Sequence, residues 1–197
     1  METLEVKATT WVKANAISAK IPDSEYYCET RDRFDVRLAA MAIVLVDKNI
    51  IGEAIAYFIK SIAGEIGNNS FDHNVGNWPD VPGVFFGYDF SGIKKQIILA
   101  DRGRGILTTL KKVKPELAQD DEAMRIAFTE RLSARLPERR GNGLKFVRES
   151  IASLHLHLDF FSGNAKAELN EKMEITEVSK SIHGCLAILS FSDNLNS

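Results

Sequence analysis

The sequence is poor in cysteine and histidine, and it lacks the motifs that would make those residues a site. Its two cysteines, Cys28 and Cys185, are too few and too far apart for a disulfide framework or a zinc cluster. Its four histidines form no HExxH pair, so a zinc hydrolase of that type is not expected. No G-x-x-x-x-G-K-[ST] motif is present, which excludes a P-loop. We expect two reduced structural thiols, as in a cytosolic protein.

Long apolar runs and an excess of charge of one sign are also missing. No apolar stretch approaches the roughly 20 residues needed to cross a bilayer. The first residues lack the basic-then-apolar pattern of a signal peptide. The 25 basic and 27 acidic residues leave a net charge of −2, so no nucleic-acid or membrane-surface footprint is visible. The composition predicts a cytoplasmic protein with no direct nucleic-acid partner and no membrane partner.

The apolar residues are sufficient for one globular core. Of the 197 residues, 45% are hydrophobic and 26% are charged, and no internal repeat is present. Hydrophobic periodicity predicts helices over 50–74, 120–133 and 143–154. Strands are predicted over 84–90, 95–100, 155–161 and 184–191, with room for another between the last two. Short hairpin strands with long helices predict an α+β fold, with helices on one face of a largely antiparallel sheet.

The first 47 residues are harder to assign. Residues 4–21 are strand-like and end at the turn signal Pro22-Asp-Ser24. Residues 34–46 fit a helix or a strand, and the spacing of their large apolar residues favours a helix: Phe34, Leu38, Met41 and Leu45. We therefore divide the chain into an N-terminal extension, residues 1–47, packed on a domain of residues 48–197.

The helix predicted over 50–74 carries an apolar stripe that turns polar. At 100° per residue, four apolar side chains lie close to one line: Ile51, Ile55, Phe58 and Ile62. The same line continues through Glu65 and Asn69 to Asp72 and His73. A polar group in a core position costs on the order of 1–3 kcal/mol unless something satisfies it. Either the helix end emerges into solvent, or Glu65 and Asn69 face a polar cavity that holds a ligand.

Poor helix formers occupy the same turns as Glu65 and Asn69. Gly64, Gly67 and Asn68 all disfavour a helix interior. A ligand close to the backbone would explain their small side chains, and a fraying helix end would tolerate them too.

Two glycine turns follow this helix. The segment Asp101-Arg-Gly103-Arg-Gly105 comes directly after an apolar strand. A carboxylate at a strand end can accept a hydrogen bond from an exocyclic amine, and the glycines allow a sharp turn. The second turn, Gly141-Asn-Gly143, opens the helix predicted over 143–154, where free amide groups can hold an anion. The alternative for each turn is an ordinary surface loop.

In this order, the three elements resemble the motifs of the GHKL family of gyrases, heat-shock chaperones, histidine kinases and MutL. Glu65-Ile-Gly-Asn-Asn69 is similar to the family's N-box, a helix with E-x-x-x-N. Asp101-Arg-Gly-Arg-Gly105 is similar to its D-x-G-x-G box, and Gly141-Asn-Gly143 to its later G-x-G box. The segment His183-Gly-Cys-Leu-Ala-Ile188 resembles the family's last strand, with Cys185 where a threonine is usual.

The resemblance implies a Bergerat fold and an ATP site. That fold is a two-layer α/β sandwich with a mixed, mainly antiparallel sheet covered on one face by helices, and with a mobile ATP lid. By resemblance, Asn69 would ligate Mg²⁺, and Glu65 would orient or deprotonate the attacking water or hydroxyl. Asp101 would read the adenine amino group, and Gly103 and Gly105 would let the lid hinge. The G-x-G box and its flanks would complete the nucleotide site with Arg140, Gly141, Gly143 and Leu144.

Arginines are frequent in the section where the lid is expected: Arg125, Arg131, Arg135, Arg139 and Arg140. A solvated helix face would account for them. Alternatively, one of the last three reaches the γ-phosphate when the lid closes.

Among GHKL proteins, the free-standing anti-sigma-factor serine kinases of bacteria are most similar in size. The 47 residues before the N-box helix contain no histidine, so self-phosphorylation on an upstream histidine is not expected. A transducer domain after residue 191, as in gyrase or MutL, is not expected either.

We expect Mg²⁺-dependent phosphotransfer from ATP to a serine or threonine of a partner regulator. The alternative is an ATP-driven switch that changes affinity for a protein partner. The intact Glu65, Asn69 and Asp101 disfavour a decayed site. The partner's identity and the choice between monomer and homodimer stay open.

Overall fold

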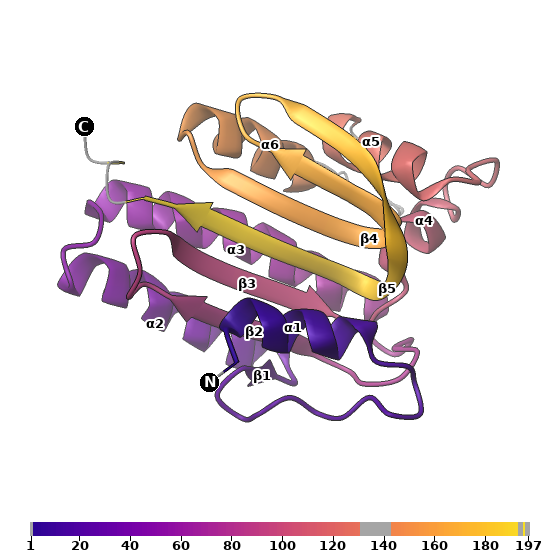
Figure 1. Cartoon of the computed structure of the whole chain (residues 1–197), viewed down its shortest axis with the longest axis horizontal. Coiled ribbons are helices and arrows are strands. Elements are labelled where there is room, and N and C mark those ends of the chain that lie inside the picture. The colour runs from indigo at the N-terminus through magenta and orange to yellow at the C-terminus, as the bar shows by residue number, and fades with distance from the viewer. Residues whose placement is uncertain (1, 131–142, 193–194, 196–197) are drawn as a thin grey trace.

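The strands form one sheet in which every neighbouring pair runs antiparallel (Figure 1). The computed structural model describes residues 2–130, 143–192 and 195. The strands are β1 (Tyr27–Cys28), β2 (Val84–Asp89), β3 (Lys95–Asp101), β4 (His157–Leu169) and β5 (Met173–Phe191). Their order across the sheet is β1-β2-β3-β5-β4. The α+β class is confirmed, and the sheet expected to be mixed is antiparallel in all described pairings.

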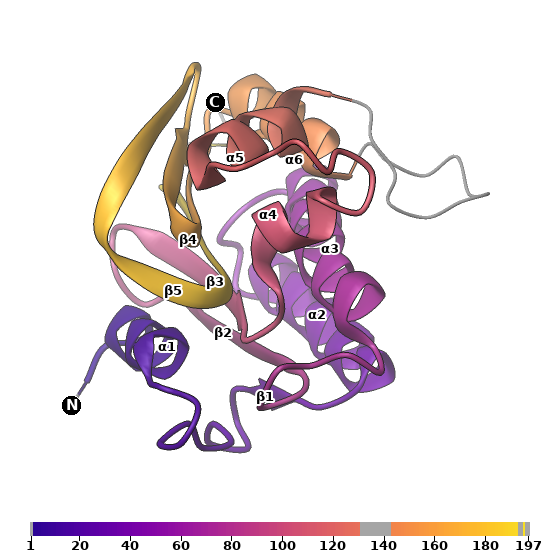
Figure 2. The same cartoon turned by 90° about the vertical axis from the view of Figure 1, so that its right-hand side faces the viewer.

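Helices lie on both faces of this sheet. They are α1 (Leu4–Lys13), α2 (Arg31–Asp47), α3 (Glu53–Asn74), α4 (Gly105–Leu110), α5 (Asp120–Thr129) and α6 (Gly143–Ser153). Figure 2 shows α2 to α6 on one side of the sheet and α1 on the other. The expectation of one covered face therefore holds for α2 to α6 and is wrong for α1. No helix among the described residues is long and apolar enough to cross a membrane.

The N-terminal segment predicted as a strand is the helix α1. Thr3 caps it, because its hydroxyl accepts a hydrogen bond from the Val6 amide at 3.3 Å. Ala8, Trp11 and Val12 are buried in a second apolar cluster, on the sheet face opposite α3. Tertiary packing thus overrides the strand preference of the β-branched and aromatic residues in this segment. The preference for a helix over 34–46 is confirmed by α2.

The main core lies between the sheet and α2, α3, α5 and α6. The buried face of α3 differs from the predicted stripe. Phe58 is 51% exposed, whereas the neighbouring Ile59 is fully buried. Ile51 is buried but precedes the helix, so it does not share a helical line with Ile55 and Phe58. Because α3 lies between α2 and the sheet, its buried arc is centred about one residue later than predicted.

Packing against α2 explains the glycines of α3. A Cβ at Gly67 would overlap the ring of Phe34, and a Cβ at Gly64 would lie 3.3 Å from Leu38 Cδ2. Phe34 and Leu38 belong to α2 and are buried. The two glycines therefore allow close approach of two helices, and neither a ligand nor a fraying end is needed to explain them.

The two late strands are longer than predicted and form a ribbon that turns back on itself. Figure 1 shows β4 and the first part of β5 reversing direction at one end of the sheet. The bend lies at Gly163 (φ +58°) and Gly184 (φ +71°), conformations that glycine adopts without strain. After the reversal, the Lys166 ammonium lies 2.7 Å from the Asp159 carboxylate of the same strand. The additional strand expected between the two is part of this ribbon.

We predict that Gly67→Ala lowers the free energy of unfolding by about 1–3 kcal/mol, because overpacking a filled core forces side chains off their positions. Phe34 cannot move away easily, since its ring contacts Phe71 and Phe86. The matched control is Gly64→Ala, which meets only the flexible end of Leu38 and gains helix propensity. Urea denaturation measures both variants. Equal losses in the two would contradict the packing explanation.

Candidate functional site

Three segments that the sequence singles out converge at one end of the sheet. The C-terminal half of α3 meets the end of β3, where the Ser70 hydroxyl donates to Asp101 Oδ2 at 2.7 Å. The same part of α3 meets the start of α6, where a Cβ on Gly143 would lie 2.6 Å from Glu65 Oε2 and 3.4 Å from Asn69 Nδ2. The structure therefore brings Glu65, Asn69, Asp101 and Gly143 into one region.

Asp101 is a buried carboxyl at the end of a strand. The residue as a whole is only 2% exposed. Besides the bond from Ser70, its Oδ1 accepts a hydrogen bond from the Gly103 amide at 2.7 Å. Burial raises the pKa of Asp101 to about 6, although the hydrogen bonds from Ser70, Gly103 and the Cys185 backbone oppose the rise. Asp101 is therefore an acceptor that changes its protonation state close to neutral pH.

Asn74, at the last position of α3, holds the glycine turn that follows Asp101. Its carboxamide is 4% exposed, donates to the Ser70 carbonyl at 2.8 Å and accepts from the Arg104 amide at 2.9 Å. A Cβ at Gly103 would overlap this carboxamide. Gly103 is therefore required here for a close approach between the turn and α3.

Gly105 starts α4 and rests on the bend of the β4–β5 ribbon. Its φ of +73° lies in the left-handed region that favours glycine. The next amide, of Ile106, donates to the Ser162 hydroxyl at 2.9 Å, and that hydroxyl donates to the Gly184 carbonyl at 3.0 Å. A Cβ at Gly184 would overlap the backbone of Asp101. Both predicted hinge glycines are thus tied to neighbouring strands and helices.

Glu65 and Asn69 lie beside the buried line of α3 and not on it. Glu65 is exposed and Asn69 is half-buried. Neither side chain makes a hydrogen bond to another described residue. The prediction that they continue the core stripe is wrong, because the buried arc of α3 is centred about one residue later than predicted. The same displacement leaves Phe58 exposed. They face the first turn of α6, where Gly143 leaves them room.

The polar residues that do continue the buried line of α3 are Ser70 and Asn74. Both follow Ile59 and Ile66 at helical spacing, and both are satisfied by the end of β3 and its glycine turn. Sequence reasoning missed them because it used a helical line displaced by about one residue. A line through Ile59, Ile62 and Ile66 would have led to them.

Two other polar residues, Asp72 and His73, lie near the end of α3. Asp72, which the sequence placed on the same line as Glu65, forms an ion pair with Arg31 of α2. That pair joins α2 to α3 beside the site. His73 is half-buried.

Several predicted site residues lie outside the described residues: Arg131, Arg135, Arg139, Arg140 and Gly141. Arg125 is described and lies exposed on α5. Leu144 is 9% exposed and belongs to the main core, so its side chain anchors the first turn of α6. In the section expected to form a lid, α4 and α5 share a small apolar cluster around Leu110 and Ile126.

Cys185 lies opposite Asp101 in the pairing of β3 with β5. Burial, and after it the charge of Asp101, raises the pKa of the Cys185 thiol well above its usual value. A raised pKa favours the protonated thiol at neutral pH and so disfavours Cys185 as a nucleophile. Among the described residues, no group of three or more His, Cys, Asp and Glu side chains could hold a metal ion. A cation at this site would need oxygen ligands from a bound molecule as well.

The region offers four chemical functions around α3. Glu65 is a carboxylate that can accept a proton, and Asn69 supplies a carboxamide oxygen of the kind that Mg²⁺ binds. The first turn of α6 leaves amide groups that can hold an anion. Asp101 adds a buried acceptor at the other side of α3.

Comparisons with known proteins add no family assignment. No family model matches the chain, and no curated protein matches it. The function is therefore inferred from the residues of the site and their geometry.

We predict that Asp101 makes stability fall as the pH rises from about 4 to 6. Its pKa is about 6 in the folded chain and near 3.8 when exposed, so the folded state holds the proton more tightly than the unfolded state. This contribution to the free energy of unfolding amounts to about 3 kcal/mol. It is fully present below pH 4 and is lost as the pH rises past 6. Asp101→Asn removes this titration. Denaturation at several pH values checks it, and parallel pH profiles of the two proteins would contradict it.

Proposed function

We propose that this chain is a Mg²⁺-dependent ATP-binding protein of the GHKL type, with a Bergerat fold, acting in the cytoplasm as a regulatory serine/threonine protein kinase. One observation carries the proposal: the E-x-x-x-N helix, the strand-end aspartate and the glycine at the start of α6 meet in space. Ser70 of that helix bonds to Asp101, while Glu65 and Asn69 lie against Gly143. These segments are far apart in the sequence, so their meeting is not a trivial result of chain proximity.

In this proposal Asp101 receives the adenine amino group. A buried carboxylate is poorly solvated, so it gains more from an additional N–H donor than an exposed one would. The oxygens of Asp101 already accept from Ser70 and Gly103, which fixes their direction. An exocyclic amine donates to this acceptor, whereas a keto group at the same position would face it with a second acceptor. The site therefore favours adenine over guanine.

The residues around Gly143 fit a magnesium-bound triphosphate. The Asn69 carboxamide has no partner among the described residues, and Gly143 has no side chain to fill the space next to Glu65. Mg²⁺ takes few ligands from protein and more from phosphates and water, which agrees with a single carboxamide at this place. Bound there, the ion would neutralise the charge of the phosphates. Amide groups at the start of α6 add favourable electrostatics for the same anion.

Glu65 would act as the general base. Its exposed carboxylate can be reached by a hydroxyl group of a partner protein, from which it takes the proton as the oxygen attacks the γ-phosphate. The same exposure suits water as the attacking group, which is the observation that favours a second function. In that case, hydrolysis would drive a conformational switch that changes the affinity for a protein partner.

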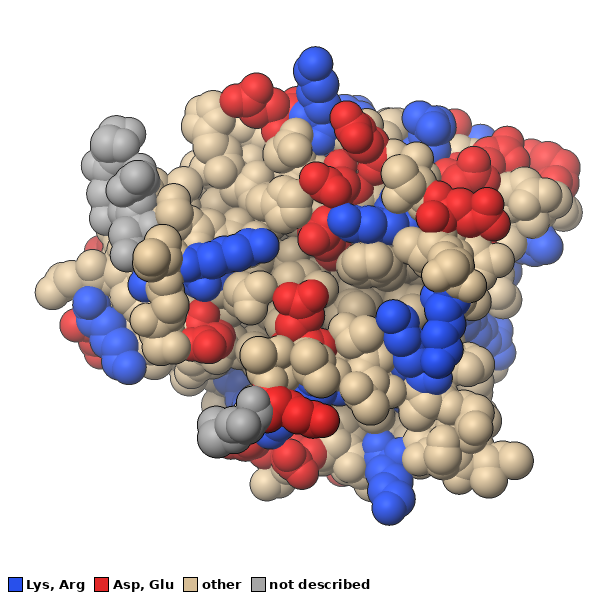
Figure 3. Space-filling view, viewed as in Figure 1, with Lys and Arg blue, Asp and Glu red and all other residues tan. Residues whose placement is uncertain are grey.

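The acceptor in this proposal is a serine or threonine of another protein. On the face shown in Figure 3, acidic and basic side chains are interspersed without an extended region of one sign. The extended basic region that nucleic acid would need is not seen on this face. Cys28 and Cys185 are free thiols, in agreement with a reducing compartment.

We predict that Asp101→Asn weakens ATP binding by at least about 100-fold, because the amide loses the negative charge and replaces one accepting carboxylate oxygen by an NH2 group, which would face the adenine amino group as a second donor. Calorimetric titration with Mg²⁺-ATP measures the dissociation constant. The matched control is Asp89→Asn, at the end of the neighbouring strand β2, which should bind ATP like the unmodified protein. Equal affinities for all three proteins would remove Asp101 from the site.

We predict that Glu65→Ala keeps ATP affinity within about threefold and lowers turnover by about 10²–10⁴-fold, the usual contribution of a general base. Glu53→Ala, at the start of the same helix, is the control and should leave turnover unchanged. Transfer of radiolabelled γ-phosphate separates the two functions. Label in a co-purifying protein favours the kinase, and release only as free phosphate favours the switch. A fully active Glu65→Ala protein would refute the role of Glu65.

A further inference from the structure

Arg102 lies between two residues of the candidate site, Asp101 and Gly103, yet it points away from them. It is fully buried and is the largest side chain that the described residues bury completely. A buried guanidinium is strongly unfavourable unless a carboxylate pairs with it and its N–H groups are satisfied. The environment of this side chain is therefore highly specific.

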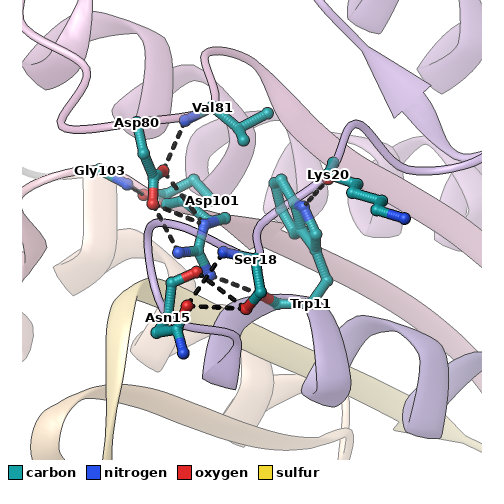
Figure 4. A network of polar contacts seen from close by, with 9 residues as sticks. Trp11, Asn15, Ser18, Lys20, Asp80, Val81, Asp101 and Gly103 are labelled. Atoms are coloured by element: carbon teal, nitrogen blue, oxygen red, sulfur yellow. Dashed lines mark hydrogen bonds and ion pairs between the residues drawn. The ribbon is translucent and has the colours of Figure 1, made fainter.

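The partners of Arg102 are Asp80 and Trp11, which come from two segments distant in the sequence and are both labelled in Figure 4. Its Nε donates to both carboxylate oxygens of Asp80 at 3.1 Å, and its Nη2 donates to Asp80 Oδ2 at 2.5 Å. Its Nη1 donates to the backbone carbonyl of Trp11 at 2.5 Å. Although burial disfavours the charged form of Asp80, the bonds from Arg102 and the Val81 amide keep the pKa of Asp80 below its usual value. The pair is thus ionised, bidentate and tied to α1.

The glycine turn is held from two sides by the same stretch of chain. In front, Asn74 fills the space beside Gly103 and accepts from the Arg104 amide. Behind, Asp80 binds the guanidinium of Arg102. Successive residues of an extended chain point to opposite sides, so fixing Arg102 toward α1 directs the Asp101 carboxyl toward α3 and Ser70.

The contact with α1 is equally well defined. Trp11 packs on Phe85 with 6.3 Å between ring centroids, and its indole N–H donates to the Lys20 carbonyl at 2.8 Å. The chain after α1 is closed by Asn15, whose side chain accepts from the Ser18 amide and hydroxyl. The Trp11 carbonyl therefore has a fixed position at which it can accept from Arg102.

We propose that Arg102 is a positioning residue: its bonds to Asp80 and to the Trp11 carbonyl set the orientation of Asp101 and couple the docking of α1 to the candidate site. The effect on ATP rests on the proposed function, whereas the effect on the glycine turn does not. Without the pair, the turn keeps its contacts with Asn74 but loses its support from behind. Coupling of this kind is reciprocal, so ATP binding should in turn protect α1.

The decisive variant replaces the pair by apolar side chains, Asp80→Leu with Arg102→Met. Such a replacement of a buried ion pair often leaves overall stability unchanged, which separates positioning from stabilisation. We expect a melting temperature within a few degrees of the unmodified protein. NMR hydrogen exchange at the Gly103 and Arg104 amides should accelerate at least about tenfold, and ATP affinity should fall at least about tenfold. Amides of α5 should exchange as before.

The matched control is Asp159→Leu with Lys166→Met, which removes an ion pair of 2.7 Å on β4. It should change neither the exchange of Gly103 nor ATP affinity. In the unmodified protein, Mg²⁺-ATP should slow exchange in α1, and in the Asp80/Arg102 double variant it should not. Unchanged exchange at Gly103 and Arg104 in a folded double variant would overturn the proposal.

The failure of the two proposals can be told apart. If the unmodified protein does not bind ATP, the proposed function fails, and exchange at Gly103 alone decides the role of Arg102. If the double variant does not fold, Arg102→Lys decides instead. Lysine keeps the charge but cannot reach Asp80 and the Trp11 carbonyl with the same planar geometry. Accelerated exchange at Gly103 in this variant supports positioning, and exchange as in the unmodified protein overturns it.

Discussion

The burial of one carboxyl group, Asp101 at the end of β3, constrains the structure around it. A buried carboxyl needs donors, and here a helix supplies one through Ser70 while the following turn supplies another through the Gly103 amide. These bonds fix the distance between α3 and the sheet at this point. They also require the chain to turn back immediately after the strand, which a residue with a side chain at position 103 could not do beside Asn74. The geometry of the candidate site follows from this requirement.

The side of the turn away from α3 carries the complementary constraint. Arg102 points to the side of the chain opposite Asp101, where its charge is paired with Asp80 and it donates to the Trp11 carbonyl of α1. A helix that covers part of the second sheet face thereby becomes connected to the candidate site. The N-terminal residues are for this reason more than a cover for apolar strands. They contribute a backbone acceptor, the Trp11 carbonyl, to the support of the glycine turn.

Sequence patterns predicted the α+β class, the β2–β3 hairpin and most helices, because these elements have strong local periodicity and turn signals. They failed at α1, where β-branched residues indicated a strand and packing of Trp11 on the sheet decided for a helix. Motif spacing predicted that Glu65 and Asp101 belong to one site, and the structure places both beside the C-terminal half of α3. It could not find Ser70 or Asn74, because the phase of a helix depends on which neighbours bury it. The partners of Arg102 are Asp80, in the loop between α3 and β2, and the backbone carbonyl of Trp11 in α1, and no sequence motif marks either of them.

The central claim is that α3, the end of β3 and the start of α6 together hold magnesium and a nucleoside triphosphate. Paramagnetic relaxation with Mn²⁺-ATP tests this directly, because Mn²⁺ broadens the NMR signals of nearby amides. The account predicts selective broadening at Asn69 and Gly143, with weaker effects at Gly103 and none at α1. Broadening that is absent, or that centres on another part of the chain, would contradict it.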